Sequence, residues 1–300
     1  MTAASTTRST LREIELDTPR GRITALRNGR SDRPPLLALH GWLDNAASFI
    51  PLAPHLHEFD LVALDLPGHG TSAHRAPGYD YAFVDWIHDV LDAMDTLGWK
   101  RAHLLGHSMG AAIATLVAAA APERVNKFAA IEALGPLSGE AALAGKSLRE
   151  AVAARRSASF RPRKIIPDIE AAVDARLAVG DMSREAARLI VARNLAPAMA
   201  GADSGFVWRS DARLTMPTHL RITEAATRSI VRAVEAPTLL IAADPAPPYF
   251  TPELRDGRMS CLRDGRLIVV PGGHHLHMEQ PEVIAPLLRA FFDWDGASKN

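Results

Sequence analysis

The sequence has a single cysteine, Cys261, so no internal disulfide can form. It also has no excess of charge, because 34 Lys and Arg residues balance 34 Asp and Glu residues. A chain without net charge exerts no general attraction on nucleic acid or on an anionic membrane surface. A lack of disulfides is typical of proteins from reducing compartments. We therefore expect a cytoplasmic protein that binds neither nucleic acid nor membrane.

Long hydrophobic runs are also missing. The longest apolar stretch, residues 109–121, is mostly alanine, ends at Pro122, and is shorter than the ~18–20 residues of a membrane-spanning helix. Residues 1–10 are rich in Thr and Ser and lack the apolar core of a secretory signal. With 47% hydrophobic and 23% charged residues, the composition is that of a globular chain. The length allows one large α/β domain or two smaller domains.

Short apolar segments alternate with helical patterns along most of the chain. The expected strands are residues 35–40, 60–65, 101–106, 125–132, 237–242 and 266–270, after an opening hairpin at 11–16 and 22–27. The expected helices between or after them are 46–56, 81–97, 109–121 and 279–294. Continuous short apolar runs are typical of parallel strands buried on both faces. The alternation predicts an α/β fold with right-handed crossovers.

Residues 137–232 interrupt this alternation. Helical spacing recurs at 139–155, 168–179, 183–195 and 223–234, and no segment has a convincing strand pattern. We expect a helical cap here, on a core formed by residues 1–136 and 233–300. The region has 16 Lys and Arg against 10 Asp and Glu, densest at Arg155, Arg156, Arg161, Arg163 and Lys164. Such a cluster is usually a solvated helix end; the alternative is attraction of an anionic substrate.

The motif Gly106-His107-Ser108-Met109-Gly110 joins an apolar strand to an alanine-rich helix. A G-x-S-x-G nucleophile elbow is a sharp turn between a strand and a helix, and this motif has that setting. A sharp turn holds the serine in strained backbone angles, and bulky residues two positions away on either side would clash. Ser108 would then stand at a helix N-terminus, where developing negative charge is stabilised. Ser108 is therefore the candidate nucleophile.

Two further motifs follow predicted strands. In His40-Gly41-Trp42, the backbone N–H of Trp42 can join that of Met109 as the pair of donors that an oxyanion requires. After the last strand, three histidines occupy positions 274, 275 and 277. A serine hydroxyl needs an imidazole to remove its proton, and we favour His274 because it comes directly after the Gly273 turn. His275 and His277 would instead pack or cap the next helix. No companion ligand has zinc-like spacing, so no metal is expected.

Together these motifs resemble the α/β-hydrolase superfamily over nearly the whole chain. His40 to Asn45, the elbow at Ser108 and the tail from His274 to Pro281 are most similar to the serine hydrolase-like proteins. The resemblance implies an eight-stranded, mostly parallel sheet with a helical cap after the sixth strand. It also implies a Ser-acid-His triad in that chain order, with His274 as the histidine.

The acid of the triad departs from the common pattern of the resemblance. Most capped members have Asp a few residues after the strand that follows the cap, but here the usual position falls near Ala246. Asp244 is the only carboxylate in that stretch. Glu132, at the end of the preceding strand, is the alternative, as in many haloalkane dehalogenases. A charge closing an apolar strand is costly unless paired, and an imidazolium supplies the partner. We favour Glu132 over Asp244, and we interpret Asp44 as a helix N-cap.

These residues predict a serine hydrolase that cleaves a small ester or related acyl substrate without a cofactor. Ser108 attacks, His274 carries the proton, Glu132 orients His274, and the amides of Trp42 and Met109 hold the oxyanion. A serine nucleophile argues against dehalogenase or epoxide hydrolase chemistry, which use aspartate at this position. The alternatives are C–C bond hydrolysis or lyase chemistry on the same triad, or a ligand-binding protein without turnover, because a fold alone does not decide function.

Overall fold

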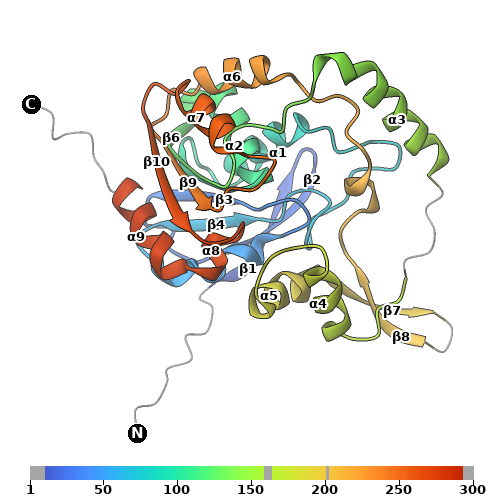
Figure 1. Ribbon diagram of the computed structural model, residues 1–300. Helices are drawn as coiled ribbons and strands as arrows, with labels where there is room; N and C mark the ends of the chain where they lie inside the picture. The colour runs from blue at the N-terminus through green and yellow to red at the C-terminus, as the bar shows by residue number, and fades with distance from the viewer. Residues whose placement is uncertain (1–10, 159–163, 201–202, 293–300) are drawn as a thin grey trace, which may run out of the picture.

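The computed structural model describes residues 11–158, 164–200 and 203–292. A twisted eight-stranded sheet crosses the molecule, with helices on both of its faces (Figure 1). Its strands are β1 (Arg12–Thr18), β2 (Gly21–Arg27), β3 (Pro35–Leu39), β4 (Asp60–Leu64), β5 (Ala102–His107), β6 (Val125–Ile131), β9 (Thr238–Asp244) and β10 (Gly265–Pro271). Their order across the sheet is β1-β2-β4-β3-β5-β6-β9-β10.

Strand direction changes only at one edge of this sheet. β1 and β2 form an antiparallel hairpin, and β2 is also antiparallel to β4. From β4 to β10 every neighbouring pair is parallel. The expectation of an eight-stranded, mostly parallel sheet is therefore confirmed. In such a sheet the carboxyl ends of the parallel strands meet at one edge, where ligands are usually bound.

The helices agree with the sequence prediction at most positions. They are α1 (Asp85–Thr96), α2 (Met109–Ala120), α3 (Ala144–Ser157), α4 (Ile169–Leu177), α5 (Arg184–Asn194), α6 (Glu224–Arg232), α7 (Pro252–Met259), α8 (Leu276–Glu279) and α9 (Pro281–Phe292). Short 3-10 turns are η1 (Ala46–Phe49), η2 (Ala53–His55), η3 (Pro122–Arg124), η4 (Ala141–Leu143) and η5 (Ala212–Thr215). Helix α7 was not predicted from the sequence. Residues 293 and 294, the last two of the helix predicted at 279–294, lie outside the described part of the chain.

One predicted helix, residues 46–56, is wrong. The structure has η1 and η2 there instead of a continuous α-helix. Pro51 and Pro54 fall inside the segment, and each lacks the backbone N–H that an α-helix interior uses. The apolar side chains of these turns are still buried against the sheet, as the pattern predicted. Only the hydrogen bonding of the backbone differs from the prediction.

The central strands contribute side chains to both faces of the sheet. Leu37 and Leu39 join the core beneath α1 and α2, whereas Leu36 and Ala38 join the core beneath η1, η2 and α9. This alternation follows from the two-residue period of a strand. All four side chains are fully buried, which explains why the strand reads as a continuous apolar run.

Residues 137–232, called the insertion below, lie between β6 and β9 in the chain. The expectation that they contain no strand is wrong, because β7 (Leu195–Ala200) and β8 (Asp203–Trp208) pair as an antiparallel hairpin. β7 is poor in residues that favour strands, since it contains Pro197 and several alanines. A long-range contact supports the hairpin: Ile166 and Phe206 exchange two backbone hydrogen bonds, both 2.8 Å.

The insertion packs in two different ways. α4, α5 and the hairpin share a small apolar cluster of their own, which includes Val173, Val191 and Leu195. α6 instead packs on α2, and its Val231 belongs to the main core. Figure 1 shows α4, α5, β7 and β8 together on one side of the molecule, away from α3 and α6. The domain boundaries at residues 136 and 232 stay a prediction.

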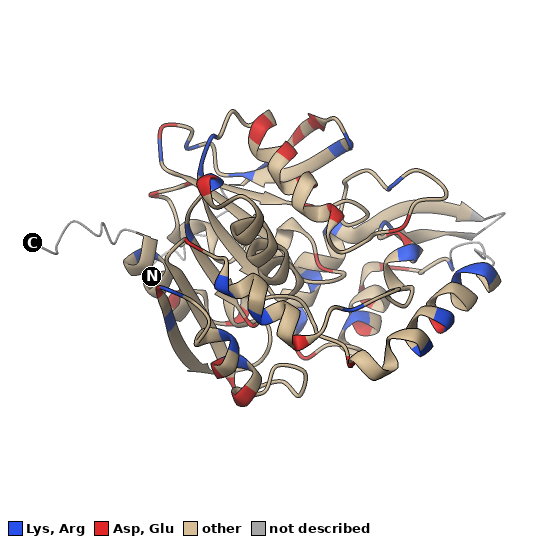
Figure 2. Cartoon of the chain, turned by 90° about the horizontal axis from the view of Figure 1, so that it is seen from above, with Lys and Arg blue, Asp and Glu red and all other residues tan. Residues whose placement is uncertain are grey.

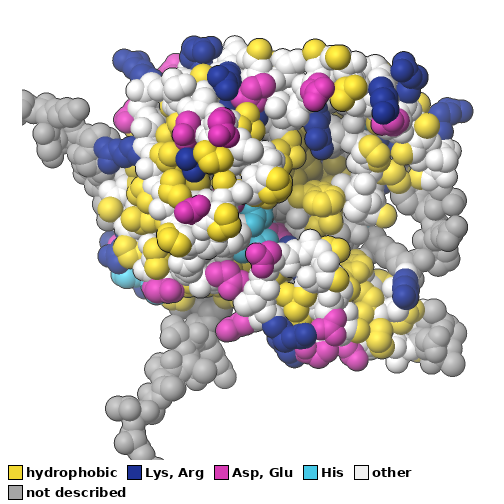
Figure 3. All heavy atoms as spheres, viewed as in Figure 1, with side chains coloured by type: hydrophobic (Ala, Val, Ile, Leu, Met, Phe, Trp, Pro, Cys, Tyr) yellow, Lys and Arg dark blue, Asp and Glu magenta, His cyan; other side chains and the backbone are white. Residues whose placement is uncertain are grey.

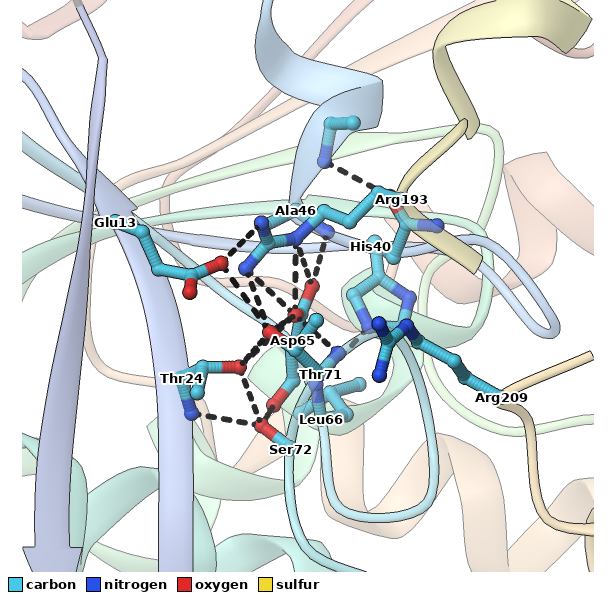
Figure 4. Close-up of polar contacts among 12 residues, drawn as sticks. Glu13, Thr24, His40, Ala46, Asp65, Leu66, Thr71, Ser72, Arg193 and Arg209 are labelled. Carbon is cyan, nitrogen blue, oxygen red and sulfur yellow. Dashed lines mark hydrogen bonds and ion pairs between the residues drawn. The ribbon is translucent and has the colours of Figure 1, made fainter. Parts of the chain in front are cut away.

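A buried carboxylate joins the insertion to the sheet. Asp65 follows β4 and accepts hydrogen bonds from the backbone N–H groups of Ala46 and Thr71, both 2.8 Å. Arg193 of α5 reaches the same carboxylate, with its Nη2 2.8 Å from Oδ2 (Figure 4). Burial pushes the pKa of Asp65 up, but the Arg193 charge and these hydrogen bonds outweigh it and hold that pKa below 3.8. These contacts therefore stabilise the folded protein at any pH above the pKa that Asp65 has in the unfolded chain. The stabilisation is lost as the pH falls through the lower pKa that Asp65 has in the folded protein.

Other arginines of the insertion also pair with carboxylates outside it. Arg155 Nε lies 2.6 Å from Asp80 Oδ2, and Arg176 Nη2 lies 3.0 Å from Asp44 Oδ1. Lys and Arg are otherwise interspersed with Asp and Glu over the molecule (Figure 2). Arg161 and Arg163 of the expected basic cluster lie outside the described residues. Part of the charge excess of the insertion is therefore used to hold it against the sheet.

None of the described helices combines the length and the apolarity that a bilayer-spanning helix needs.

We expect Arg193→Met to lower the free energy of unfolding by about 3–5 kcal/mol, because it leaves the fully buried Asp65 without its cation. Arg184→Met is the matched control: Arg184 is also on α5, but its partners Glu170 and Asp174 are exposed. That change should cost less than about 1 kcal/mol. Urea unfolding at neutral pH measures both. Equal losses in the two variants would show that Arg193 does not hold the insertion.

Candidate active site

Ser108 occupies the sharp turn between β5 and α2. Its backbone angles are φ 50° and ψ −115°, in the left-handed half of the map that L-residues avoid. A Cβ at Gly110 would lie 2.0 Å from the Leu39 carbonyl oxygen, and one at Gly106 would lie 2.4 Å from the Ala111 Cα. Both positions therefore require glycine. The strained angles, which cost on the order of 1–3 kcal/mol, leave the serine side chain part-exposed at the start of α2.

Glu132 directly follows the adjacent strand β6. It also has a left-handed backbone, φ 64°, and its N–H donates to the Ile241 carbonyl at 3.0 Å. Its carboxylate is 1% exposed. Oε1 accepts the Ala243 N–H at 2.5 Å, and Oε2 lies 3.1 Å from His274 Nδ1. The backbone of β9 and the imidazole thus share one buried carboxylate.

His274 lies on the loop between β10 and α8. An ionised carboxylate can only accept, so Nδ1 carries the hydrogen that faces Glu132 and Nε2 keeps its lone pair. The His274 carbonyl accepts a hydrogen bond of 2.9 Å from His107 Nε2, which ties this loop to the residue before Ser108. The Ser108 hydroxyl makes no hydrogen bond within the described residues; in resting enzymes such contacts are often long.

The other two histidines of the tail lie elsewhere. His275 Nε2 is 3.3 Å from Asp44 Oδ2, and His277 is fully buried with no hydrogen bond to either nitrogen in the described chain. Burial lowers the pKa of His277 to about 3 and, together with the neighbouring His277, holds that of His107 well below its usual range. These two rings are therefore neutral near pH 7. Of the three candidates, His274 is the one that contacts a candidate acid and is part-exposed.

Asp244, the second candidate acid, does not contact His274. Asp244 is exposed, and its carboxylate makes no hydrogen bond or ion pair with any described residue. Its carbonyl accepts the Gly272 N–H at 3.0 Å, so its backbone serves the sheet edge. The structure thus brings His274 together with Glu132 and not with Asp244.

The loop after β3 has a different construction from the one expected. The N-cap of η1 is Asn45, whose side chain accepts the Ala47 N–H at 3.0 Å, so the interpretation of Asp44 as that cap is wrong. Asp44 is instead buried beside Arg176 and His275. Burial pushes the pKa of Asp44 up, but its hydrogen bond to His275 and these neighbouring charges outweigh it and hold the pKa well below the usual range.

Trp42 lies in the loop after β3, and Met109 begins α2 directly after Ser108. The Trp42 indole Nε1 donates to the Leu214 carbonyl at 3.1 Å, which joins the loop after β3 to the insertion. Met109 is the first residue of α2, where helix N–H groups have no partner within the helix. Neither amide donates to a protein acceptor within the described ranges. Their role as oxyanion donors stays a prediction.

Tyr249 is a neighbour of His274 that the sequence analysis missed. Its hydroxyl lies 3.1 Å from His274 Nδ1 and 3.4 Å from Nε2, and the residue is 46% exposed. Burial raises the pKa of Tyr249 to about 12, and the charge of Glu132 acts in the same direction. The hydroxyl is therefore protonated near neutral pH. No motif marks this residue, because its position depends on the course of the loop after β9.

The surface above this region is hollowed. Figure 3 shows a depression lined largely by hydrophobic side chains, with histidine side chains at one edge. The depression lies between the side of the molecule that carries α3 and the side that carries α4 and α5 (compare Figure 1). A mostly apolar hollow with a few polar groups at its edge is the usual character of a small-molecule site.

Comparisons with known proteins identify the same fold. A family model described as the alpha/beta hydrolase fold matches residues 34–281. A serine hydrolase-like protein of Dictyostelium discoideum is 32% identical over 81% of this chain and 70% of its own length. One from Danio rerio is 29% identical over 96% of this chain and 90% of its own length.

A solved structure of a hypothetical protein from Pseudomonas aeruginosa has 42% sequence identity and a TM-score of 0.87, covering 94% of this chain and 99% of that one. The fold, the strained serine between two required glycines and these matches lead to one conclusion. The chain belongs to the α/β-hydrolase family, and within it the chain is similar to the serine hydrolase-like proteins.

Proposed function

We propose that the protein is a serine hydrolase that cleaves a small ester, or a related acyl compound, through a covalent acyl-enzyme. Ser108 is the nucleophile, His274 the general base and Glu132 the acid. The observation that carries the proposal is the contact of 3.1 Å between the buried Glu132 carboxylate and His274 Nδ1, on a loop tied to the residue before Ser108. Serine hydrolase-like relatives over most of the chain support it.

The first chemical step follows from the tautomer of His274. With its hydrogen on Nδ1, the imidazole presents the Nε2 lone pair as the base that takes the Ser108 proton. The serine oxygen then bonds to the acyl carbon, and the imidazolium is stabilised by the charge of Glu132. The imidazolium returns its proton to the leaving alkoxide. Water, activated by the same nitrogen, later releases the acid and restores the serine.

The oxyanion of each tetrahedral intermediate needs donors in fixed positions. The N–H of Met109 belongs to the first turn of α2, where the helix dipole favours negative charge. The N–H of Trp42 supplies the second donor, from a loop held by the indole contact with Leu214. Donors of this kind are each worth on the order of 3 kcal/mol of barrier lowering. The reaction requires no cofactor.

The substrate is proposed to be small and to have an apolar acyl group. The hollow in Figure 3 is lined largely by hydrophobic side chains. Arg155, a member of the basic cluster from which attraction of an anion was expected, pairs with Asp80 instead. An anionic substrate therefore has less support than a neutral ester.

Ser108→Ala should abolish labelling by a fluorophosphonate probe and reduce ester hydrolysis by at least roughly a thousandfold, because the attacking oxygen is removed. Ser260→Ala, which removes an exposed hydroxyl on the far end of α7, is the control and should be labelled like the wild type. Gel fluorescence after probe treatment measures the labelling. Undiminished labelling of Ser108→Ala would rule out this nucleophile.

The two candidate acids are distinguished by a pair of isosteric variants. Glu132→Gln keeps the size of the side chain but cannot stabilise the imidazolium, so kcat should fall by roughly a thousandfold to ten-thousandfold. Asp244→Asn should leave kcat within about twofold, because its exposed carboxylate makes no hydrogen bond or ion pair with a described residue. Steady-state hydrolysis of an activated ester measures both variants. The reverse ranking would assign the acid to Asp244.

The reaction class can be tested with a substrate panel. We expect kcat/KM for short acyl esters to exceed that for diketones and cyanohydrins, because the proposed site has an acyl-transfer triad and no group dedicated to carbanion stabilisation. Raising the ionic strength should change hydrolysis of a neutral ester little. A strong preference for diketones or cyanohydrins would replace the ester hydrolase proposal with the C–C hydrolase or lyase alternative.

A further inference from the structure

Next to His274 lies a second group of titratable residues that the mechanism does not use. Asp44, His107 and His275, called the Asp44 cluster below, are 1%, 0% and 5% exposed. One ligand atom from each lies within 4.8 Å of the others. They come from three loops or strand ends: after β3, at the end of β5 and before α8. Their burial and convergence distinguish them from an exposed acidic patch.

The ring of His107 directs a lone pair into this cluster. Its Nε2 faces the His274 carbonyl at 2.9 Å, and a carbonyl can only accept, so Nε2 carries the hydrogen. The neutral ring then has a lone pair on Nδ1. That atom is buried, has no hydrogen-bond partner within the described chain, and faces Asp44 Oδ2 at 3.9 Å. Two electron-pair donors thus face one another without a donated hydrogen between them.

The two oxygens of the Asp44 carboxylate have different neighbours, and Oδ2 is the one that faces the two histidines. Oδ1 accepts a hydrogen bond from Arg176 Nη2 at 3.0 Å. Oδ2 has only the longer contact of 3.3 Å with His275 Nε2. His275 Nδ1 is buried and unpartnered in the described residues. Because the Asp44 carboxylate can only accept, Nε2 carries the hydrogen in the metal-free protein. Binding of an ion at Nε2 requires this hydrogen to move to Nδ1.

We propose that the Asp44 cluster binds a divalent transition-metal ion of the Zn²⁺ type, through Asp44 Oδ2, His107 Nδ1 and His275 Nε2. Imidazole and carboxylate ligands suit Zn²⁺, and two histidines with one carboxylate form a known ligand set. With metal–ligand bonds of about 2.1 Å, tetrahedral ligands lie ~3.4 Å apart. Asp44 Oδ2 already lies 3.3 Å from His275 Nε2 and 3.9 Å from His107 Nδ1, and all three ligand atoms lie within 4.8 Å of one another, so the side chains must move closer together to bind the ion.

Arg176 sets the character of this site. Its guanidinium holds the carboxylate in place, as residues behind a metal ligand commonly do. Its positive charge also opposes the charge of the ion and lowers the affinity. The site therefore suits an ion that binds reversibly at raised metal concentration rather than one held permanently.

Binding of the ion would act on the proposed catalytic residues. His107 immediately precedes Ser108, and His275 immediately follows His274. His107 also donates to the His274 carbonyl, so rotating its ring toward the metal shifts the loop that carries the general base. The ion is thus an inhibitor of hydrolysis; this second part rests on the proposed function, whereas metal binding does not.

The binding test uses Co²⁺ as a spectroscopic substitute for Zn²⁺, on the full chain without an affinity tag. We expect one Co²⁺ per chain, with the intense visible absorption of a tetrahedral complex, displaced by added Zn²⁺. Asp44→Asn and His275→Gln, which keep hydrogen-bonding groups, should each weaken binding by at least about 10-fold. His57→Gln is the control, since His57 is an exposed histidine beside Glu58. It should bind like the wild type.

Absence of tetrahedral Co²⁺ absorption in the wild type would overturn the proposal, as would unchanged binding by folded Asp44→Asn and His275→Gln. If neither variant folds, wild-type crystals soaked in ZnCl₂ decide the matter by anomalous scattering. A peak between the three ligand atoms supports the site, and a peak elsewhere or none overturns it.

Inhibition is measured separately, by fluorophosphonate labelling with and without ZnCl₂. Zn²⁺ should suppress labelling of the wild type and of His57→Gln at least about 10-fold more than that of His275→Gln, each compared with its own metal-free sample. Equal labelling of the wild type with and without saturating Zn²⁺ would remove the inhibitory role. No labelling of metal-free wild type would instead count against the proposed function, and the Co²⁺ result would still decide the metal site.

Discussion

The charge of one buried carboxylate constrains the carboxyl edge of the sheet. Glu132 is almost fully buried, and an ionised carboxylate in that position is costly unless hydrogen bonds and a partner stabilise it. The Ala243 amide and the His274 imidazole provide them. β6, β9 and the loop after β10 must therefore keep their relative positions. The same arrangement fixes the tautomer of His274, from which the proposed chemistry follows.

Two buried ion pairs join the insertion to loops that follow strands of the sheet. Arg193 of α5 binds Asp65 after β4, and Arg176 of α4 binds Asp44 after β3, in the loop that also carries Trp42. The carboxylates in both pairs are nearly fully buried, and breaking such a pair leaves an uncompensated charge. The arginine excess of the insertion therefore has a structural use. This also links the Asp44 cluster to the position of α4.

The parts of the site that the sequence predicted are those with local signals. Ser108 is marked by its glycines and by the strand and helix around it, and Glu132 by a charge at the end of an apolar run. The hairpin β7–β8, the contact of Tyr249 with His274 and the burial of Asp44 were missed or misread. The hairpin is local, but β7 contains a proline and several alanines and so lacks a strand pattern. The other two depend on residues farther away in the chain; Asp44 and His275 are 231 positions apart. Spacing within a segment does not encode such contacts. The wrong helix at residues 46–56 has a local cause, because Pro51 and Pro54 prevent a continuous α-helix there.

The most direct test of the catalytic account is a crystal structure of the protein after reaction with a fluorophosphonate. The account predicts phosphorus bonded to Ser108 Oγ, with a phosphonyl oxygen within hydrogen-bond distance of the Trp42 and Met109 amides. It also predicts His274 Nε2 beside the ester oxygen, with Nδ1 still on Glu132. An adduct on another residue, or a phosphonyl oxygen directed away from both amides with His274 apart from it, would contradict the account.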